Sequence, residues 1–201
     1  SSNLLLVGCS SAEPTSSSIW YWNISNLKWK FTNHFWPHYL FISQTSISQT
    51  LNDLDLKNGF RHFKLGSSPS LIKDIVKNEN QLFEKPNVVV YEYVGNDINN
   101  LFNVKVEGIE LHFFKNKLYM IIVYFENFEL SDFDRILSAL ENTYGKKWVK
   151  PSNIDDKTLN GAIWGGKNVV LELLKMNNLY MGGYISVYDK KLSNAVYSSN
   201  F

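Results

Sequence analysis

The sequence has a single cysteine, almost no net charge and no long apolar run, and each absence excludes a class of protein. One cysteine cannot form a disulfide framework, a thiolate zinc site or an iron–sulfur cluster. Twenty Lys and Arg against nineteen Asp and Glu give a net charge of +1, which argues against a nucleic-acid binder with its clustered positive charge. No apolar run approaches the roughly 20 residues that a membrane-spanning helix needs.

Apolar and aromatic residues are plentiful, at 44% and 15% of the 201 residues. This content is enough for a hydrophobic core, so the chain as a whole is not disordered. Residues 1–60 carry six charged side chains and residues 61–201 carry the other 33. The shift predicts an aromatic-rich segment over residues 19–58 and a globular domain over residues 59–201, behind a Ser-rich stretch that ends at residue 18.

The tetrad Leu6-Val7-Gly8-Cys9 resembles a bacterial lipobox, in which an aliphatic residue and two small residues precede a cysteine. The resemblance implies that residues 1–18 are a signal-peptide remnant and tether, in which residues 1–8 are the tail of the signal peptide. Cys9 would then receive a lipid and become the mature N-terminus. The Ser-rich stretch that follows would then serve as a flexible tether. The alternative is a short buried strand over residues 4–9, with Cys9 packed as a small apolar side chain.

Nine aromatic residues lie close together after this tether, namely Trp20, Tyr21, Trp22, Trp29, Phe31, Phe35, Trp36, Tyr39 and Phe41. One interpretation is a hairpin that folds onto the domain, with its rings packed across strands. A second is a partner-binding or membrane-interface patch, and a third is a platform that stacks against sugars. The candidate binding residues are Trp20, Trp22, Trp29 and Trp36.

The domain is expected to begin with a helix. Ser68 and Pro69 suit a helix start, and the stripe that follows has helical spacing until Pro86 ends it. Strands are then expected over residues 88–94, 104–113 and 118–125. The phase of the apolar alternation changes near Gly108, which predicts a bulge or a tight turn.

The same order then recurs. A second helix is expected from Ser131, as its cap, to Gly145, followed by strands at 161–164, 168–175 and 180–189. Short connections make consecutive strands antiparallel. We therefore expect an α+β fold, a two-layer sandwich in which two helices cover an antiparallel sheet, with a possible (αβββ)2 pseudo-repeat.

This order behind a lipobox resembles the fold shared by β-lactamase-inhibitor proteins and the small lipoprotein of the outer-membrane barrel-assembly machinery. The stretch Phe60-Arg61-His62-Phe63-Lys64-Leu65-Gly66 is similar to the entry to the first helix in many bacterial envelope proteins. The resemblance implies a non-catalytic protein that binds other proteins. No binding residue transfers from these families, because no motif matches position by position.

No constellation predicts catalysis, a metal site or a cofactor. His34 and His38 have the spacing of a helical metal site, but Pro37 lies between them and works against a helix. His112 alternates with apolar neighbours, so we expect it on the solvent side of a strand. The run Gly165-Gly166-Lys167 is explained by a hairpin turn.

The sequence thus predicts a non-catalytic lipoprotein of the bacterial cell envelope, anchored in the membrane through Cys9, that binds another protein without nucleic acid or cofactor. An inhibitor or immunity-type role is one form of this function. A surface carbohydrate-binding protein that uses the tryptophans, and an unrecognised envelope hydrolase, are the alternatives.

Overall fold

The computed structural model describes residues 49–79, 85–152, 159–176 and 182–199. Three α-helices occur within these ranges: α2 (Gln49–Lys57), α3 (Leu130–Tyr144) and α4 (Lys190–Ser198), together with a short 3-10 turn, η2 (Pro69–Leu71). The strands are β1 (Gly59–Phe60), β2 (Phe63–Lys64), β3 (Ile75–Lys77), β4 (Val88–Tyr93), β5 (Asn100–Leu101), β6 (Val104–Phe114), β7 (Lys117–Phe125), β8 (Leu159–Gly165), β9 (Val169–Met176) and β10 (Gly183–Asp189).

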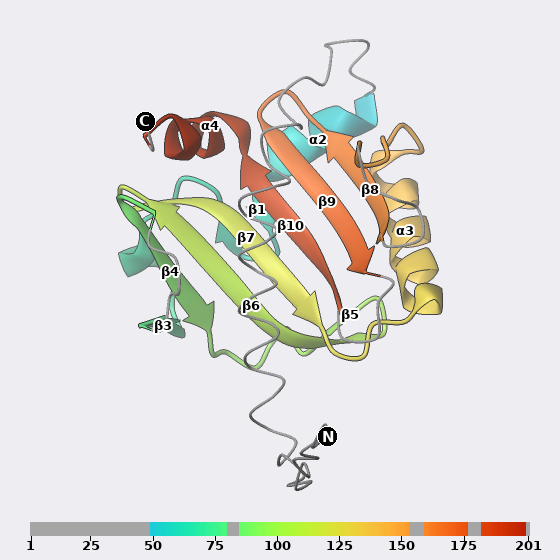
Figure 1. Ribbon diagram of the computed structural model, residues 1–201, viewed down its shortest axis with the longest axis horizontal. Coiled ribbons are helices and arrows are strands. Elements are labelled where there is room, and N and C mark those ends of the chain that lie inside the picture. The colour runs from blue at the N-terminus through green and yellow to red at the C-terminus, as the bar shows by residue number, and fades with distance from the viewer. Residues whose placement is uncertain (1–48, 80–84, 153–158, 177–181, 200–201) are drawn as a thin grey trace, which may run out of the picture.

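The fold is mostly β, which corrects the expected α+β sandwich of two helices over a sheet. One antiparallel sheet of eight strands has the order β3-β4-β6-β7-β10-β9-β8, with β5 paired to β6 beside this path (Figure 1). A separate hairpin of β1 and β2 occupies the stretch expected to lead into the first helix. The (αβββ)2 pseudo-repeat is therefore wrong, because its first helix is not formed.

The segment expected to be that helix contains η2 and the edge strand β3. Ser68 makes no side-chain cap hydrogen bond, and the 3-10 turn ends after three residues. Ile75 and Val76 are β-branched, and β-branched residues favour an extended chain. The backbone groups of β3 form hydrogen bonds with β4, and the sequence alone does not reveal this pairing. The apolar spacing of this segment is helical, and the pairing of β3 with β4 overrides it.

The strands at the centre of the sheet follow the sequence closely. β7 lies between β6 and β10, as its apolar residues on both faces predict. The expected irregularity near Gly108 is confirmed, because the β6–β7 register shifts between Val106 and Gly108. Lys115 and Asn116 both have positive φ, 48° and 62°, as a two-residue hairpin turn requires.

The main hydrophobic core lies on one face of the sheet. Buried side chains of β6, β7, β9 and β10 meet α2, α3 and the β1–β2 hairpin there, and these elements lie on that side of the sheet in Figure 1. Leu54 of α2, Phe63 of β2 and Ile136 of α3 are fully buried in this cluster. The opposite face holds a second cluster, in which Val196 of α4 packs among residues that include Met120 and Tyr188.

The second expected helix is present as α3, but its cap differs. Glu129 rather than Ser131 is the N-cap, and it forms a capping box with Asp132. The C-terminal prediction is confirmed, because Gly145 has a positive φ of 83° and its N–H bonds the carbonyl oxygen of Glu141. The indole Nε1 of Trp164 donates to the carbonyl oxygen of Gly145 at 2.8 Å, which joins the end of α3 to β8.

Helix α2 is held to the β8–β9 turn by one carboxylate. Asp55 accepts hydrogen bonds from the backbone N–H groups of Lys167, Asn168 and Val169, at 2.6, 2.8 and 2.8 Å. The expected hairpin turn at Gly165-Gly166-Lys167 is thus confirmed. A Cβ at Gly166 would lie 2.7 Å from an Asp55 carboxylate oxygen, so only glycine allows this close approach.

Candidate functional site

The residues predicted to bind or to carry a lipid lie outside the described part of the chain. This applies to Cys9 and to the four tryptophans Trp20, Trp22, Trp29 and Trp36. A candidate site among the described residues therefore has to come from the sheet and its edges.

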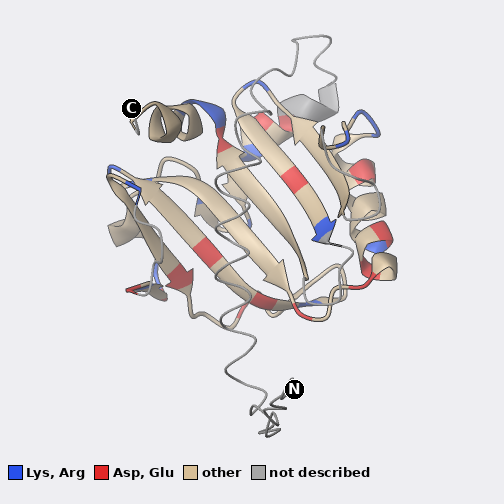
Figure 2. Ribbon diagram, viewed as in Figure 1, with Lys and Arg blue, Asp and Glu red and all other residues tan. Residues whose placement is uncertain are grey.

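Three glutamates share one cross-strand row on the face opposite the main core. Glu92 of β4 pairs with Glu110 of β6, and Glu110 pairs with Ile122 of β7. Ile122 pairs with Ser186 of β10, and Ser186 pairs with Glu172 of β9. We call Glu92, Glu110 and Glu172 the acidic row; Figure 2 shows acidic positions on the three strands that carry it. The row places three carboxylates in line across the sheet.

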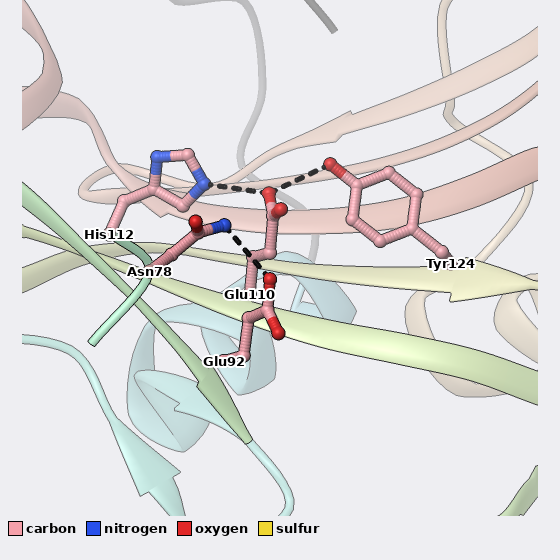
Figure 3. Close-up of polar contacts among 5 residues, drawn as sticks. All are labelled: Asn78, Glu92, Glu110, His112 and Tyr124. Atoms are coloured by element: carbon pink, nitrogen blue, oxygen red, sulfur yellow. Dashed lines mark hydrogen bonds and ion pairs between the residues drawn. The ribbon is translucent and has the colours of Figure 1, made fainter. Parts of the chain in front are cut away.

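Glu110 is at the centre of a small polar cluster (Figure 3). Its Oε2 accepts a hydrogen bond from the Tyr124 hydroxyl at 3.0 Å and lies 3.3 Å from Nε2 of His112. Beside it, the Asn78 amide Nδ2 donates to Glu92 at 2.8 Å. Burial, with Glu110 as the next largest cause, raises the pKa of Tyr124 well above its usual value. Tyr124 is therefore a hydrogen-bond donor to the carboxylate at all physiological pH values.

Glu172 forms the second carboxylate cluster of the row. Its two oxygens accept hydrogen bonds from the Ser186 hydroxyl and the Tyr188 hydroxyl, both at 3.1 Å. Burial raises the pKa of Glu172 to about 7, while these two hydrogen bonds act in the opposite direction. Near neutral pH this carboxyl group is therefore divided between its protonated and ionised forms, whereas an ordinary glutamate is ionised.

Glu110 and Glu172 are too far apart to divide an acid and a base role between them. Glu110 and Glu172 are three strand spacings apart, on the order of 14 Å at about 4.8 Å per strand. Paired carboxylates that divide an acid and a base role are about 5 to 10 Å apart. In the described ranges no group of three or more His, Cys, Asp or Glu is arranged to hold a metal ion.

The two outer strands of the sheet differ in whether further backbone pairs with their outer edge. At β8, the backbone of Val149 bridges that of Ile163 through two hydrogen bonds of 3.0 Å. Trp164 is fully buried beside this bridge and Trp148 is half-buried. We call this region, residues 148–152 and β8 with the β8–β9 turn, the sealed end. A cavity of about 150 Å³ lies there, lined by Phe133, Trp148, Lys150, Pro151, Leu159, Asn160 and Gly161.

β3 forms the other edge, which we call the open end. The Asn78 and Val94 amides bond the carbonyl oxygens of Val90 and Asp74, so the even-numbered residues of β3 face β4. By the antiparallel alternation, the backbone groups of Ile75 and Lys77 point away from the sheet. Among the described residues, β3 pairs with β4 alone.

Exposed apolar side chains accompany this open edge. Leu71 in η2 is 77% exposed, Val76 in β3 is 56% exposed and Val94 directly after β4 is 60% exposed. Lys77 forms an exposed ion pair with Glu79 at 3.1 Å. A strand edge with unpaired backbone groups and apolar neighbours is a template for another strand.

The sequence missed most of this arrangement. His112 faces away from its apolar neighbours as expected, but its side chain is only 12% exposed and contacts Glu110, so the prediction of a solvent-side residue is wrong. Glu110 and His112 are two residues apart in a strand, and this spacing was the one available sign that they share a face. His62, which has no partner evident from the sequence, lies 3.4 Å from Asp97.

Comparison with known proteins gives one match. A family model described as the TP0088 domain matches residues 58–197. No curated protein and no solved structure is significantly similar to the chain. Within the described ranges, no helix is both long and apolar enough to cross a membrane.

Proposed function

The chain belongs to the TP0088 domain family, and we propose that its domain is a non-catalytic binding module of the bacterial cell envelope that captures another protein at the open end of its sheet. The partner contributes an extended segment that adds to β3 as a further antiparallel or parallel strand. The lipobox-like Leu6-Val7-Gly8-Cys9 supports the location, because a lipid on Cys9 would hold the domain at a membrane.

One observation carries this proposal, namely the outward backbone groups of Ile75 and Lys77 beside three exposed apolar side chains. Strand addition uses main-chain hydrogen bonds for affinity and alternate side chains for specificity. Leu71, Val76 and Val94 supply the apolar contacts that the partner's side chains would cover. The shortness of β3 and the charge of Lys77 limit indiscriminate pairing, which is how native edge strands avoid aggregation.

The geometry of strand addition also fits an inhibitor or immunity role, in which the domain occupies a strand-binding groove of its target. In either case the contact is one of backbone pairing with an apolar flank. No covalent step is required of the domain.

The experiment compares envelope proteins retained by the immobilised full chain and by two variants at Lys77. Lys77→Pro places a residue without an N–H at the outward position, where it breaks no bond to β4. Lys77→Ala is the matched control, because it removes the ion pair to Glu79 but leaves the edge free. We expect a partner that the wild type and Lys77→Ala retain and that Lys77→Pro loses.

Amide hydrogen exchange then tests the mode of binding. On addition of the purified partner, exchange should slow at Ile75 and Lys77, whose N–H groups point outward, with little change at Val76. Retention by Lys77→Pro as strong as that by the wild type would refute the proposal. A wild-type dimer in sedimentation that Lys77→Pro abolishes would replace the partner by a second copy of the chain.

A separate measurement tests the location. The intact mass of the protein produced in a bacterium with its own leader should include a diacylglycerol group, and Cys9→Ser should remove it. An unmodified Cys9 in the membrane-free fraction would contradict the envelope assignment.

A further inference from the structure

The acidic row belongs to a face with a distinct composition. One neighbouring cross-strand row consists of Val90, His112, Met120, Tyr188 and Val170, and the other of Gly108, Tyr124, Tyr184, Leu174 and Gly161. These three rows therefore contain three carboxylates and three tyrosines, and none of their described residues is Lys or Arg. We call this surface the acidic face. Glu110 and Glu172 are buried, and Tyr188 is buried in the cluster that contains Val196 of α4. The accessible part of the face, with Glu92 exposed and Tyr124 and Tyr184 half-buried, favours a basic, aromatic ligand.

The same chain contains a segment of that composition. Between Glu13 and Asp53 there is no acidic residue, whereas Lys28, Lys30, His34 and His38 all lie there. Nine of its residues between 19 and 41 are aromatic. Four of these are tryptophans, whose indole N–H groups are donors only and thus match carboxylate acceptors. Left in water, so many rings in one stretch would be a liability for aggregation.

The length of the chain and the place where the described part begins allow the segment to reach the face. The described residues begin at Gln49 in α2, and α2 contacts β9, the second strand from the sealed end. From Gln49 back to Lys28 an extended chain spans up to about 70 Å at about 3.3 Å per residue. The whole sheet is only about 29 Å wide, from six spacings of about 4.8 Å. The segment is therefore long enough to pass around the edge at β8.

On these grounds we propose that residues 19–48 bind intramolecularly across the acidic face, with Lys28 and Lys30 near the acidic row and the tryptophans among the tyrosines. The occupant is thus the protein's own aromatic segment, and the face differs from the open end, where the partner strand would add. The inference goes beyond the proposed function and does not depend on it, because neither surface needs the other to be correct.

The first test is zero-length carbodiimide cross-linking of the full chain, which joins a lysine to a carboxylate in direct contact. An equimolar mixture of ¹⁵N-labelled and unlabelled protein separates links within one chain from links between chains. Lys105 and Glu126, at 2.5 Å and exposed, supply the internal positive control. We expect links from Lys28 or Lys30 to Glu92 or Glu110 in which both peptides carry the same isotope.

Two outcomes of this test would overturn the inference. Links with mixed isotopes would show that the segment occupies the face of a second copy. Loss of every link to the acidic row while the Lys105–Glu126 link forms would show that the segment lies elsewhere.

The second test uses charge reversal and tryptophan fluorescence, since four of the six tryptophans lie in the segment. The doubly reversed variant Lys28→Glu/Lys30→Glu should show a higher acrylamide quenching constant and a red-shifted emission. Adding Glu92→Lys, at the exposed member of the acidic row, should partly restore both values. Lys146→Glu/Lys147→Glu, an exposed pair after α3, is the matched control and should leave them unchanged. Equal quenching in wild type and Lys28→Glu/Lys30→Glu would refute the proposed contact.

Discussion

Both outer strands of the sheet are antiparallel to their neighbours, but only one of them pairs with further backbone along its outer edge. At the sealed end, Val149 bridges the outer strand and Trp164 is fully buried. At the open end, β3 has outward backbone groups, and Val76 is more than half exposed. One outer strand is thus paired with further backbone, whereas the other has outward backbone groups to which another strand could add.

The glutamates of the acidic row follow the same contrast. Glu172, two strands from Val149 across the sheet, is 2% exposed and accepts hydrogen bonds from Ser186 and Tyr188. Glu92, next to the open end, is exposed and bonded by Asn78. Glu110 is buried like Glu172, although its strand lies next to β4, so the exposed carboxylate of the row is the one nearest the open end.

The largest expected effect is the loss of Trp164 from the sealed end. Trp164→Ala removes a fully buried ring and its hydrogen bond to Gly145, and should lower the free energy of unfolding by about 3 to 5 kcal/mol. Urea unfolding monitored by circular dichroism measures this change. A loss below about 1 kcal/mol would mean that the sealed end does not stabilise the domain more than an ordinary surface site.

The next effect is a pH dependence from Glu172. Its pKa in the folded protein, about 7, exceeds the usual value of 4.5, so the folded state binds more protons than the unfolded state between these values. The contribution of Glu172 to the free energy of unfolding is therefore fully present below pH 4.5 and is lost as the pH rises from there through 7. Between pH 5 and pH 8 the loss amounts to about 2 to 3 kcal/mol.

Urea unfolding of wild type and Glu172→Gln at several pH values isolates this contribution. The difference in free energy of unfolding between the two proteins should change by about 2 to 3 kcal/mol between pH 5 and pH 8. Tyr188→Phe removes a hydrogen bond that lowers the pKa of Glu172, so its loss of stability should extend to a higher pH than in the wild type. Parallel pH profiles for wild type and Glu172→Gln would contradict the raised pKa.

A smaller loss of stability is expected when the hydrogen bonds between Asp55 of α2 and the β8–β9 turn are removed. Asp55→Ala leaves three backbone N–H groups without their acceptor and should cost about 2 kcal/mol, because exposed groups among them regain water. Asp53→Ala, at an exposed position of the same helix, is the control and should change stability by no more than about 0.5 kcal/mol. Chemical unfolding of both variants checks the ranking, and equal stabilities would remove the special role given to Asp55.

The smallest effect is expected at the open end. Val76→Ala removes a mostly exposed side chain from an edge strand and should change the free energy of unfolding by less than about 0.5 kcal/mol. The same variant should weaken partner retention, because the apolar flank of β3 is reduced. A stability loss like that of Trp164→Ala would abolish the distinction between the two ends.

The sequence predicted the parts of the fold that depend on local signals. Alternating apolar residues and tight turns indicated the central strands, including β7, and Gly145 indicated the end of α3. The helix expected after Pro69 was wrong because pairing with β4, which no local pattern specifies, holds the β-branched Ile75 and Val76 in an extended chain. Helix α4 was not predicted, although Asp189 accepts a hydrogen bond from the Leu192 amide as a helix cap does.

The candidate sites were less accessible to prediction because their contacts are distant in sequence. Asp55 binds a turn more than 110 residues away, and only Gly166 hints at a close neighbour there. Glu172 and Ser186 meet through the β9–β10 register, which no local pattern specifies. The openness of β3 likewise follows from its position at the end of the strand order, so it becomes evident only when the whole sheet is known.

The Asp55 carboxylate also sets how the domain would respond to tension. A chain anchored ahead of α2 transmits any pull into the domain through this helix, which adjoins the first strand of the β1–β2 hairpin. Three hydrogen bonds at one carboxylate must then break together before α2 can peel from the β8–β9 turn. Such a pull would therefore pass from α2 into the β8–β9 turn, at the end of the sheet opposite β3.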